Sequence, residues 1–152
     1  MGWLGLGNWR EAAAELEAVA PALSRHPVVL RLRYEIHAQA GHWDLASQAA
    51  FIFARTMPDE PGAWIKLAYA IRRKPGGGIP PAKEILAAAR RRFPAEALIA
   101  YNLACYECQL GNLAQARVLL REAFQLGDLA QLKRLSLSDP DLEPLRREIT
   151  LM

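Results

Sequence analysis

Apolar residues recur at spacings of three and four along most of the chain, which is the pattern of amphipathic helices. Between Pro27 and Gly41 such a stretch carries a wide apolar face made of Val29, Leu30, Leu32, Ile36 and Ala40. Proline suits a first helical turn, and glycine can adopt the left-handed conformation that ends a helix. Similar stripes predict helices from Trp9 to before Pro21, over Trp43–Thr56, from about Glu60 to Lys74, from Ala82 to Pro94, in two segments over Ala97–Gln125, and over Leu129–Leu135.

A glycine turn followed by polar and apolar residues recurs between these helices. It reads Gly7-Asn-Trp-Arg-Glu-Ala12 first, then Gly41-His-Trp-Asp-Leu-Ala46, and Gly111-Asn-Leu-Ala-Gln-Ala116 in the most regular stretch. Gly7 and Gly41 are 34 residues apart, and Gly41 and Gly111 are 70 apart, which is two such periods plus two residues. The extra residues belong to a glycine- and proline-rich loop at 74–81, where the chain is expected to loop out.

In its 34-residue period of helix–turn–helix units the chain resembles the tetratricopeptide-repeat (TPR) family, over about residues 7 to 126. The resemblance implies an all-α fold, a right-handed α-solenoid of antiparallel helix pairs with about 3.5 repeats and a C-terminal capping helix. In this family small residues lie where paired helices approach most closely. Here the matching positions are Ala12, Ala46, Ala68, Ala82, Ala104 and Ala116.

One domain over residues 1–152 is expected, with a half repeat at 7–26, repeats at 27–58, 60–94 and 95–126, and a cap and tail at 127–152. We expect Asn8 to cap the first helix, whose Trp9, Ala13 and Leu16 side would lack a partner helix. Weak dimerisation, or packing of Trp3 and Leu4 on this side, would cover it. The sequence leaves open whether the natural protein begins here.

The C-terminal end is expected to close the last repeat. Leu129, Leu132 and Leu135 can cover its apolar face, as the end of a helical repeat array requires. The ending Ser138-Asp-Pro-Asp-Leu-Glu-Pro-Leu145 resembles the tails of many bacterial TPR proteins. Each Asp-Pro or Glu-Pro step can restart a short helical turn, so Leu142 and Leu145 are expected to fold back against the cap.

The composition argues against three classes of protein: nucleic-acid binders, disulfide-rich scaffolds and membrane proteins. A formal charge of +3 is too small to indicate a nucleic-acid binder by itself, and two cysteines are too few for a disulfide scaffold. No apolar run approaches the ~20 residues of a membrane span, and no signal-peptide pattern is present. We therefore expect a soluble, cytoplasmic protein without nucleic-acid or membrane partners.

Cys105 and Cys108 form the only Cys-x-x-Cys pair, inside a predicted helix. They can be small semi-buried or groove-lining residues, a metal site or a redox pair. A structural zinc site needs four ligands, and the three histidines His26, His37 and His42 fall in a different repeat. No catalytic set is visible, so we predict no enzyme activity, no cofactor and no metal.

The family resemblance also implies a binding site, because exposed positions of the first helices in TPR pairs line a concave groove that receives peptides. Matched by period, the groove residues are Arg31, Glu35, Ile65, Lys66, Tyr69, Arg72, Arg73, Tyr101, Asn102 and Cys105. The full carboxylate clamp of the chaperone-binding subfamily is absent, since Leu32 and Lys66 occupy two places that match Asn102.

The expected function is non-enzymatic binding of a peptide or partner segment. Positive charge around Tyr69 and Tyr101 favours an acidic or carboxylate-ended peptide. Alternatively, Arg72 and Arg73 merely stabilise a helix C-terminus. A different class of function is also open: an architectural module that self-associates, or docks onto the rest of a longer repeat protein, through its N-terminal helix face.

Overall fold

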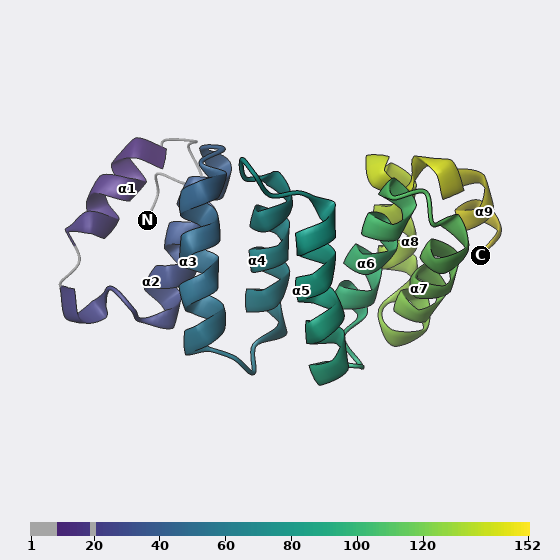
Figure 1. Cartoon of the computed structure of the whole chain (residues 1–152), viewed down its shortest axis with the longest axis horizontal. Coiled ribbons are helices and arrows are strands. Elements are labelled where there is room, and N and C mark those ends of the chain that lie inside the picture. Colours follow the sequence, from purple (N-terminus) through teal and green to yellow (C-terminus); the bar gives the residue numbers. More distant parts are fainter. Residues whose placement is uncertain (1–8, 19–20) are drawn as a thin grey trace. The chain divides into compact units, whose positions relative to one another are not determined.

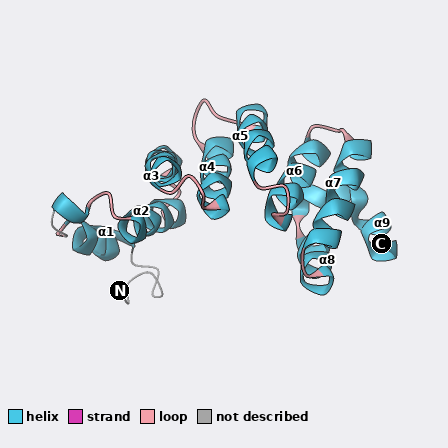
Figure 2. Cartoon of the chain, turned by 90° about the horizontal axis from the view of Figure 1, so that it is seen from below, coloured by secondary structure: helices cyan, strands magenta, loops and turns pink. Residues whose placement is uncertain are grey.

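The computed structural model describes residues 9–18 and 21–152, and within these ranges every regular element is helical (Figures 1 and 2). The predicted roles of Asn8, Trp3 and Leu4 fall outside the described residues. The elements are α1 (Trp9–Glu17), η1 (Pro21–Leu23), α2 (Pro27–Gln39), α3 (Trp43–Thr56), α4 (Pro61–Arg73), α5 (Ile79–Arg92), α6 (Ala97–Gln109), α7 (Leu113–Leu126), α8 (Leu129–Ser138), η2 (Pro140–Leu145) and α9 (Arg146–Leu151).

The predicted helix signals act as expected in the two regular turns. Gly41 and Gly111 adopt positive φ angles of 73° and 82°, a region that costs other residues energy, and α3 and α7 follow each turn directly. α2 starts at Pro27, where the His26 side chain accepts a hydrogen bond of 3.3 Å from the Val28 backbone N–H. The all-helical architecture of successive antiparallel helices is therefore confirmed for the described residues.

The loop expected at 74–81 is shorter than predicted. α5 already begins at Ile79, so Pro80 and Pro81 lie in its first turn, where a missing N–H costs nothing. The turn is tight at Gly77, because a Cβ there would come within 1.9 Å of the Ile71 carbonyl oxygen. The Gly78 N–H donates to that same carbonyl at 3.1 Å and closes the turn.

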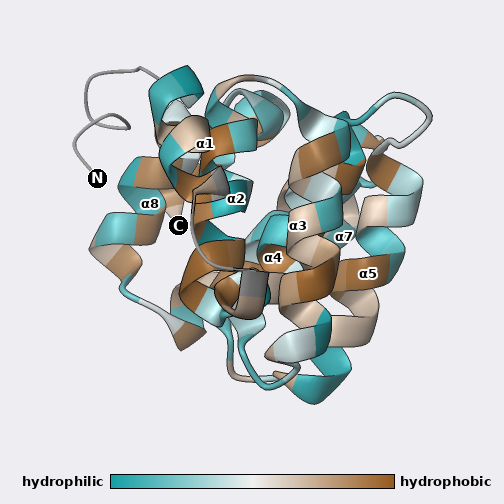
Figure 3. Ribbon diagram, turned by 90° about the vertical axis from the view of Figure 1, so that its left-hand side faces the viewer, coloured by the Kyte–Doolittle hydropathy of each residue, from teal (hydrophilic) through white to brown (hydrophobic). Residues whose placement is uncertain are grey.

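The structure divides into two compact units, residues 1–82 and 83–152, called here the N-terminal and the C-terminal unit. In the N-terminal unit α3 packs against both α2 and α4 (Figure 1). Figure 3 shows hydrophobic and hydrophilic residues together on the labelled helices, as amphipathic packing requires. The alanines at the predicted close approaches, Ala46 and Ala68, are completely buried.

The first helix is covered more fully than expected. Leu16 is only 8% exposed and, with Ala12, packs in a cluster with Val29 and Ile36 of α2. The expectation that the Leu16 side of α1 stays bare is therefore wrong. The reason is that α1 packs on α2 through this side, while Trp9 also lies edge-on to the His42 ring with 4.9 Å between centroids.

In the C-terminal unit α6 and α7 form the closest helix pair, with Ala104 and Ala116 completely buried. Leu132 of α8 is buried as predicted, but Leu129 and Leu135 are exposed, so α8 covers less than expected. The fold-back of the tail supplies the rest: Leu142 and Leu145 are completely buried, as predicted. Among the described helices, none is long and apolar enough to cross a membrane.

Candidate functional site

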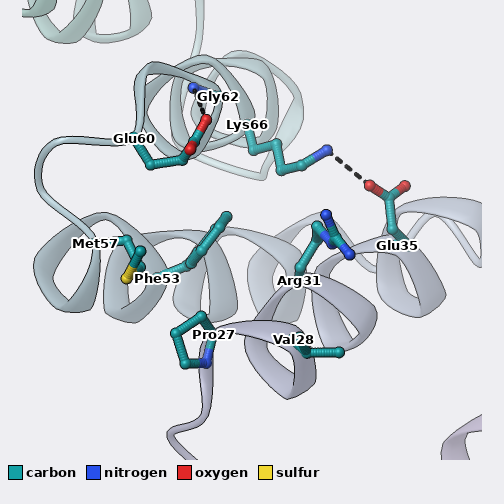
Figure 4. A pocket seen from close by; sticks show the side chains of 9 residues that line it. All are labelled: Pro27, Val28, Arg31, Glu35, Phe53, Met57, Glu60, Gly62 and Lys66. Atoms are coloured by element: carbon teal, nitrogen blue, oxygen red, sulfur yellow. Dashed lines mark hydrogen bonds and ion pairs between the residues drawn. The ribbon is translucent and has the colours of Figure 1, made fainter.

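A cavity of about 580 Å³ lies along the N-terminal unit, between α2, the end of α3 and the start of α4 (Figure 4). It contains three of the predicted groove residues, Arg31, Glu35 and Lys66. Its complete lining is Pro27, Val28, Arg31, Glu35, Phe53, Met57, Glu60, Gly62 and Lys66. The chemistry of this lining is mixed, because an apolar floor is edged by charged side chains.

The described lining of this cavity carries two cations, Arg31 and Lys66, and two anions, Glu35 and Glu60. Lys66 Nζ pairs with Glu35 Oε1 at 2.7 Å and also lies 4.9 Å from the centre of the Tyr34 ring. Glu60 Oε1 accepts the Gly62 N–H at 3.3 Å as the N-cap of α4. Arg31 is exposed, and Figure 4 shows its guanidinium pointing toward the Lys66–Glu35 pair without a bond drawn to it.

A second cavity, of about 420 Å³, adjoins the first, since the linings of both include Glu35 and Lys66. It holds the predicted residues Ile65 and Tyr69. Its complete lining is Tyr34, Glu35, Ala38, Gln39, Trp43, Ile65, Lys66 and Tyr69. We call the two cavities together the α2–α4 groove.

An aromatic and cationic cluster stands at the far end of this groove. The Trp43 and Tyr69 ring centres are 5.8 Å apart, and Arg73 Cζ lies 3.4 Å from the Tyr69 centre and 5.5 Å from that of Trp43. Arg73 also donates to the Tyr69 carbonyl at 3.1 Å. This bond is what a helix-end role for Arg73 predicts. Arg72 is half-buried. Neither Arg72 nor Arg73 is among the described residues that line the two cavities.

The predicted groove residues of the fourth repeat are not open to solvent. Tyr101 and Cys105 are only 4% and 3% exposed, because η2 packs on α6. The Tyr101 hydroxyl donates to Asp139 Oδ2 at 2.8 Å, and Gln109 Nε2 donates to the Asp141 carbonyl at 3.0 Å. The expectation that Tyr101 and Cys105 line an open groove is therefore wrong, since the chain's own C-terminal segment fills that place.

Asn102 is half-buried and turned back on its own helix, where its side chain donates to the Leu98 carbonyl at 2.7 Å. The structure thus brings together Arg31, Glu35, Ile65, Lys66 and Tyr69 in one groove of the N-terminal unit, whereas Tyr101, Asn102 and Cys105 belong to the C-terminal unit. Sequence reasoning missed Trp43, Phe53 and Met57, which come from second helices or their ends. Their signal was available, because these large apolar residues lie in, or directly after, the predicted helix Trp43–Thr56.

Cys105 also lies near two acidic side chains. The search of the sequence for metal ligands considered only the histidines and did not include these two acids. One ligand-type atom each of Cys105, Asp139 and Asp141 lies within 4.8 Å of the other two. Asp139 is already engaged, since its carboxylate accepts from Tyr101, from the Cys105 thiol at 3.7 Å and from the Asp141 N–H at 2.9 Å. These contacts therefore explain the group as one that holds the C-terminal segment on α6. The absence of a bound metal stays a prediction.

Comparison with models of known protein families finds no match to this chain, and comparison with curated proteins finds none either. The α2–α4 groove is therefore the feature of the molecule from which a function is inferred.

Proposed function

We propose that this chain is a TPR-like, non-enzymatic interaction module that binds a peptide or partner segment in the α2–α4 groove. The observation that carries the proposal is that the two cavities adjoin, with Glu35 and Lys66 in both linings. Five of the predicted groove residues line them, from two successive first helices of the repeat. Recognition sites for segments of other proteins combine apolar contact area with a few placed polar groups.

The lining fits this description. Val28 and Tyr69 are large exposed apolar or aromatic side chains on the two ends of the groove, and such side chains bind with little loss of conformational entropy. The Lys66–Glu35 pair lies between the cavities and can orient a partner through its polar groups. An extended or helical segment is the kind of partner that such a groove receives.

The test is a selection of peptides from a random display library on the intact chain. Binding of the selected peptides is then measured on two double variants that are matched in exposed apolar area. Val28→Ser with Tyr69→Ser changes both cavities, whereas Leu45→Ser with Phe51→Ser changes exposed residues of α3 that line neither. We expect the groove variant to lose binding at least tenfold and the control to retain it.

All four residues are exposed, so both variants should keep the fold, which circular dichroism melting checks. The proposal is wrong if the library gives no specific peptide, or if both double variants bind the selected peptides equally well.

A further inference from the structure

The C-terminal unit contains an occupied counterpart of the α2–α4 groove. α2 and α6 both have 13 residues, α3 and α7 both have 14, and each α3 position corresponds to the α7 position 70 residues later. α4 follows the first pair as α8 follows the second. On the second set η2 packs against α6 and also touches α7 and α8. The chain therefore shows how this helix arrangement can hold a short acidic segment, here in a 3-10 helical turn.

Two hydrogen bonds fix that segment on α6. Tyr101, one turn into the helix, donates to the Asp139 carboxylate, and Gln109, two turns further on, donates to the Asp141 carbonyl. The segment thus runs along α6 in the direction of the helix. Its next residue, Leu142, is completely buried. A carboxylate contact, a backbone contact and an apolar anchor follow one another in that order.

The corresponding positions on α2 carry side chains able to make the same contacts. Arg31 stands 70 residues before Tyr101, and Gln39 stands 70 before Gln109. Both are exposed in the groove, and arginine forms charge-assisted bonds to carboxylates that are stronger than those of a tyrosine hydroxyl. Glu35 replaces Cys105, but its charge is paired with Lys66, so it does not leave an unpaired anion beside Arg31.

An apolar anchor would also find its place. On α6 the apolar residue follows the glutamine contact. In the N-terminal unit the cavity that Gln39 lines is also lined by Trp43, Ile65 and Tyr69. Arg73, stacked on Tyr69, adds positive charge at this end. The surface is complementary to an acidic segment with one apolar residue.

We propose, building on the function above, that the α2–α4 groove binds an acidic segment of a partner protein with the pattern Asp-x-Asp-apolar. The first carboxylate binds Arg31, the carbonyl of the second aspartate binds Gln39, and the apolar side chain enters the cavity formed by Trp43, Ile65 and Tyr69. The chain's own segment does not serve, because it is seated on α6 with Leu142 and Leu145 buried.

The probe is a fluorescein-labelled, amidated peptide with the sequence of residues 138–145, Ser-Asp-Pro-Asp-Leu-Glu-Pro-Leu. Fluorescence anisotropy with the full chain is expected to show saturable binding that weakens with added salt. Arg31→Ala is expected to weaken it at least tenfold, and Gln39→Ala several-fold. The peptide carrying D139N is expected to lose about as much as Arg31→Ala costs.

Two matched controls separate the groove from other sites. Arg55→Ala removes the same charge from an exposed position of α3 that lines neither cavity, and it should leave binding unchanged. Gln109→Ala removes the α6 counterpart of Gln39. If Gln109→Ala weakens binding and Gln39→Ala does not, the peptide has displaced the chain's own segment from α6 and the inference is overturned.

The inference is also overturned if the peptide does not bind, or binds the Arg31→Ala variant as well as the unchanged chain. These failures are distinct from failure of the proposed function. If the library selection yields basic or neutral peptides that require Val28 and Tyr69, the groove binds segments but not acidic ones. If the selection also yields nothing, both ideas fall together.

Discussion

At the scale of single residues, the two cysteines owe their chemistry to the segment that covers them. Burial raises the pKa of the Cys105 thiol, and the nearby charges of Asp139 and Asp141 raise it further. Burial also raises the pKa of Cys108, again with help from Asp141. The thiolate is the reactive form of cysteine, so both shifts act against oxidation and alkylation.

We expect both thiols to react slowly with an aromatic disulfide reagent in the folded chain at pH 8, because the thiolate is disfavoured and access is blocked. The positive control is the same sample unfolded in about 6 M guanidinium. There the reagent should react rapidly with two thiols per chain, one for each of the two cysteines. Rapid labelling of either thiol in the folded chain would show that η2 leaves α6 readily.

Glu107 is a buried carboxylate whose pKa is shifted in favour of its charged form, unlike the pKa values of the two thiols. Burial opposes ionisation of Glu107, but hydrogen bonds from Lys83 and Asn112 outweigh it and hold the pKa of Glu107 below its ordinary value. Lys83 Nζ lies 2.6 Å from Glu107 Oε1, and Asn112 Nδ2 lies 2.7 Å from Oε2. The depressed pKa means that ionised Glu107 stabilises the fold above its ordinary pKa, and that this is lost as the pH falls through the folded value.

Lys83→Met should lower the free energy of unfolding by about 2 kcal/mol at pH 7, because it leaves a buried carboxylate with one donor fewer. The difference from the unchanged chain should be smaller at an acidic pH below the lowered pKa of folded Glu107, where its carboxylate is protonated in both proteins. Urea denaturation at the two pH values measures this. Lys133→Met, which removes the same charge from α8, should show no such pH-dependent difference.

The residue scale also shows where prediction from sequence stops. The 34-residue period predicts that Tyr101 and Cys105 share one face of α6, and in the structure η2 packs on α6. Periodicity reports which residues share a face and says nothing of what covers it. The contact between Tyr101 and Asp139 joins residues 38 positions apart, and Asp139 lies in the C-terminal segment that follows the repeats, for which no period exists.

At the scale of elements, the ends of helices could be predicted where a single residue has a strong backbone preference. Gly41 and Gly111 end α2 and α6, and α3 has the predicted bounds Trp43–Thr56. The start of α5 was predicted too late, because Pro80 and Pro81 both break a helix interior and suit a first turn. Sequence alone does not decide between these two roles of proline.

The short element η2 is expected to be a principal support of the C-terminal unit. Leu142→Ala should lower the stability by about 3 kcal/mol, since it leaves a cavity at a completely buried side chain. Leu151→Ala makes the same chemical change in α9 at a position that is 89% exposed, and it should have almost no effect. Equal effects of the two substitutions in chemical denaturation would contradict the packing of η2 on α6.

At the scale of the whole molecule, burial of Leu16 changes what the N-terminal helix is expected to do. Leu16→Glu should destabilise the chain by about 3 kcal/mol or more, because it places a charge in the cluster of Ala12, Val29 and Ile36. Leu23→Glu is the matched control, since Leu23 of η1 is 49% exposed. A self-associating α1 face would give the opposite result: Leu16→Glu would shift light scattering toward smaller particles and leave the melting temperature unchanged.

The hydrogen bond between Tyr101 and Asp139 has a consequence for the synthesis of this protein on the ribosome. Ribosomes add about 5–20 residues per second, so the 38 residues between these partners take roughly two to eight seconds to be made. For that time the emerging chain has α6 without its cover, with both cysteines and a tyrosine face open to oxidants and to other nascent chains. The thiols that are protected for the life of the folded molecule are therefore most vulnerable during its synthesis.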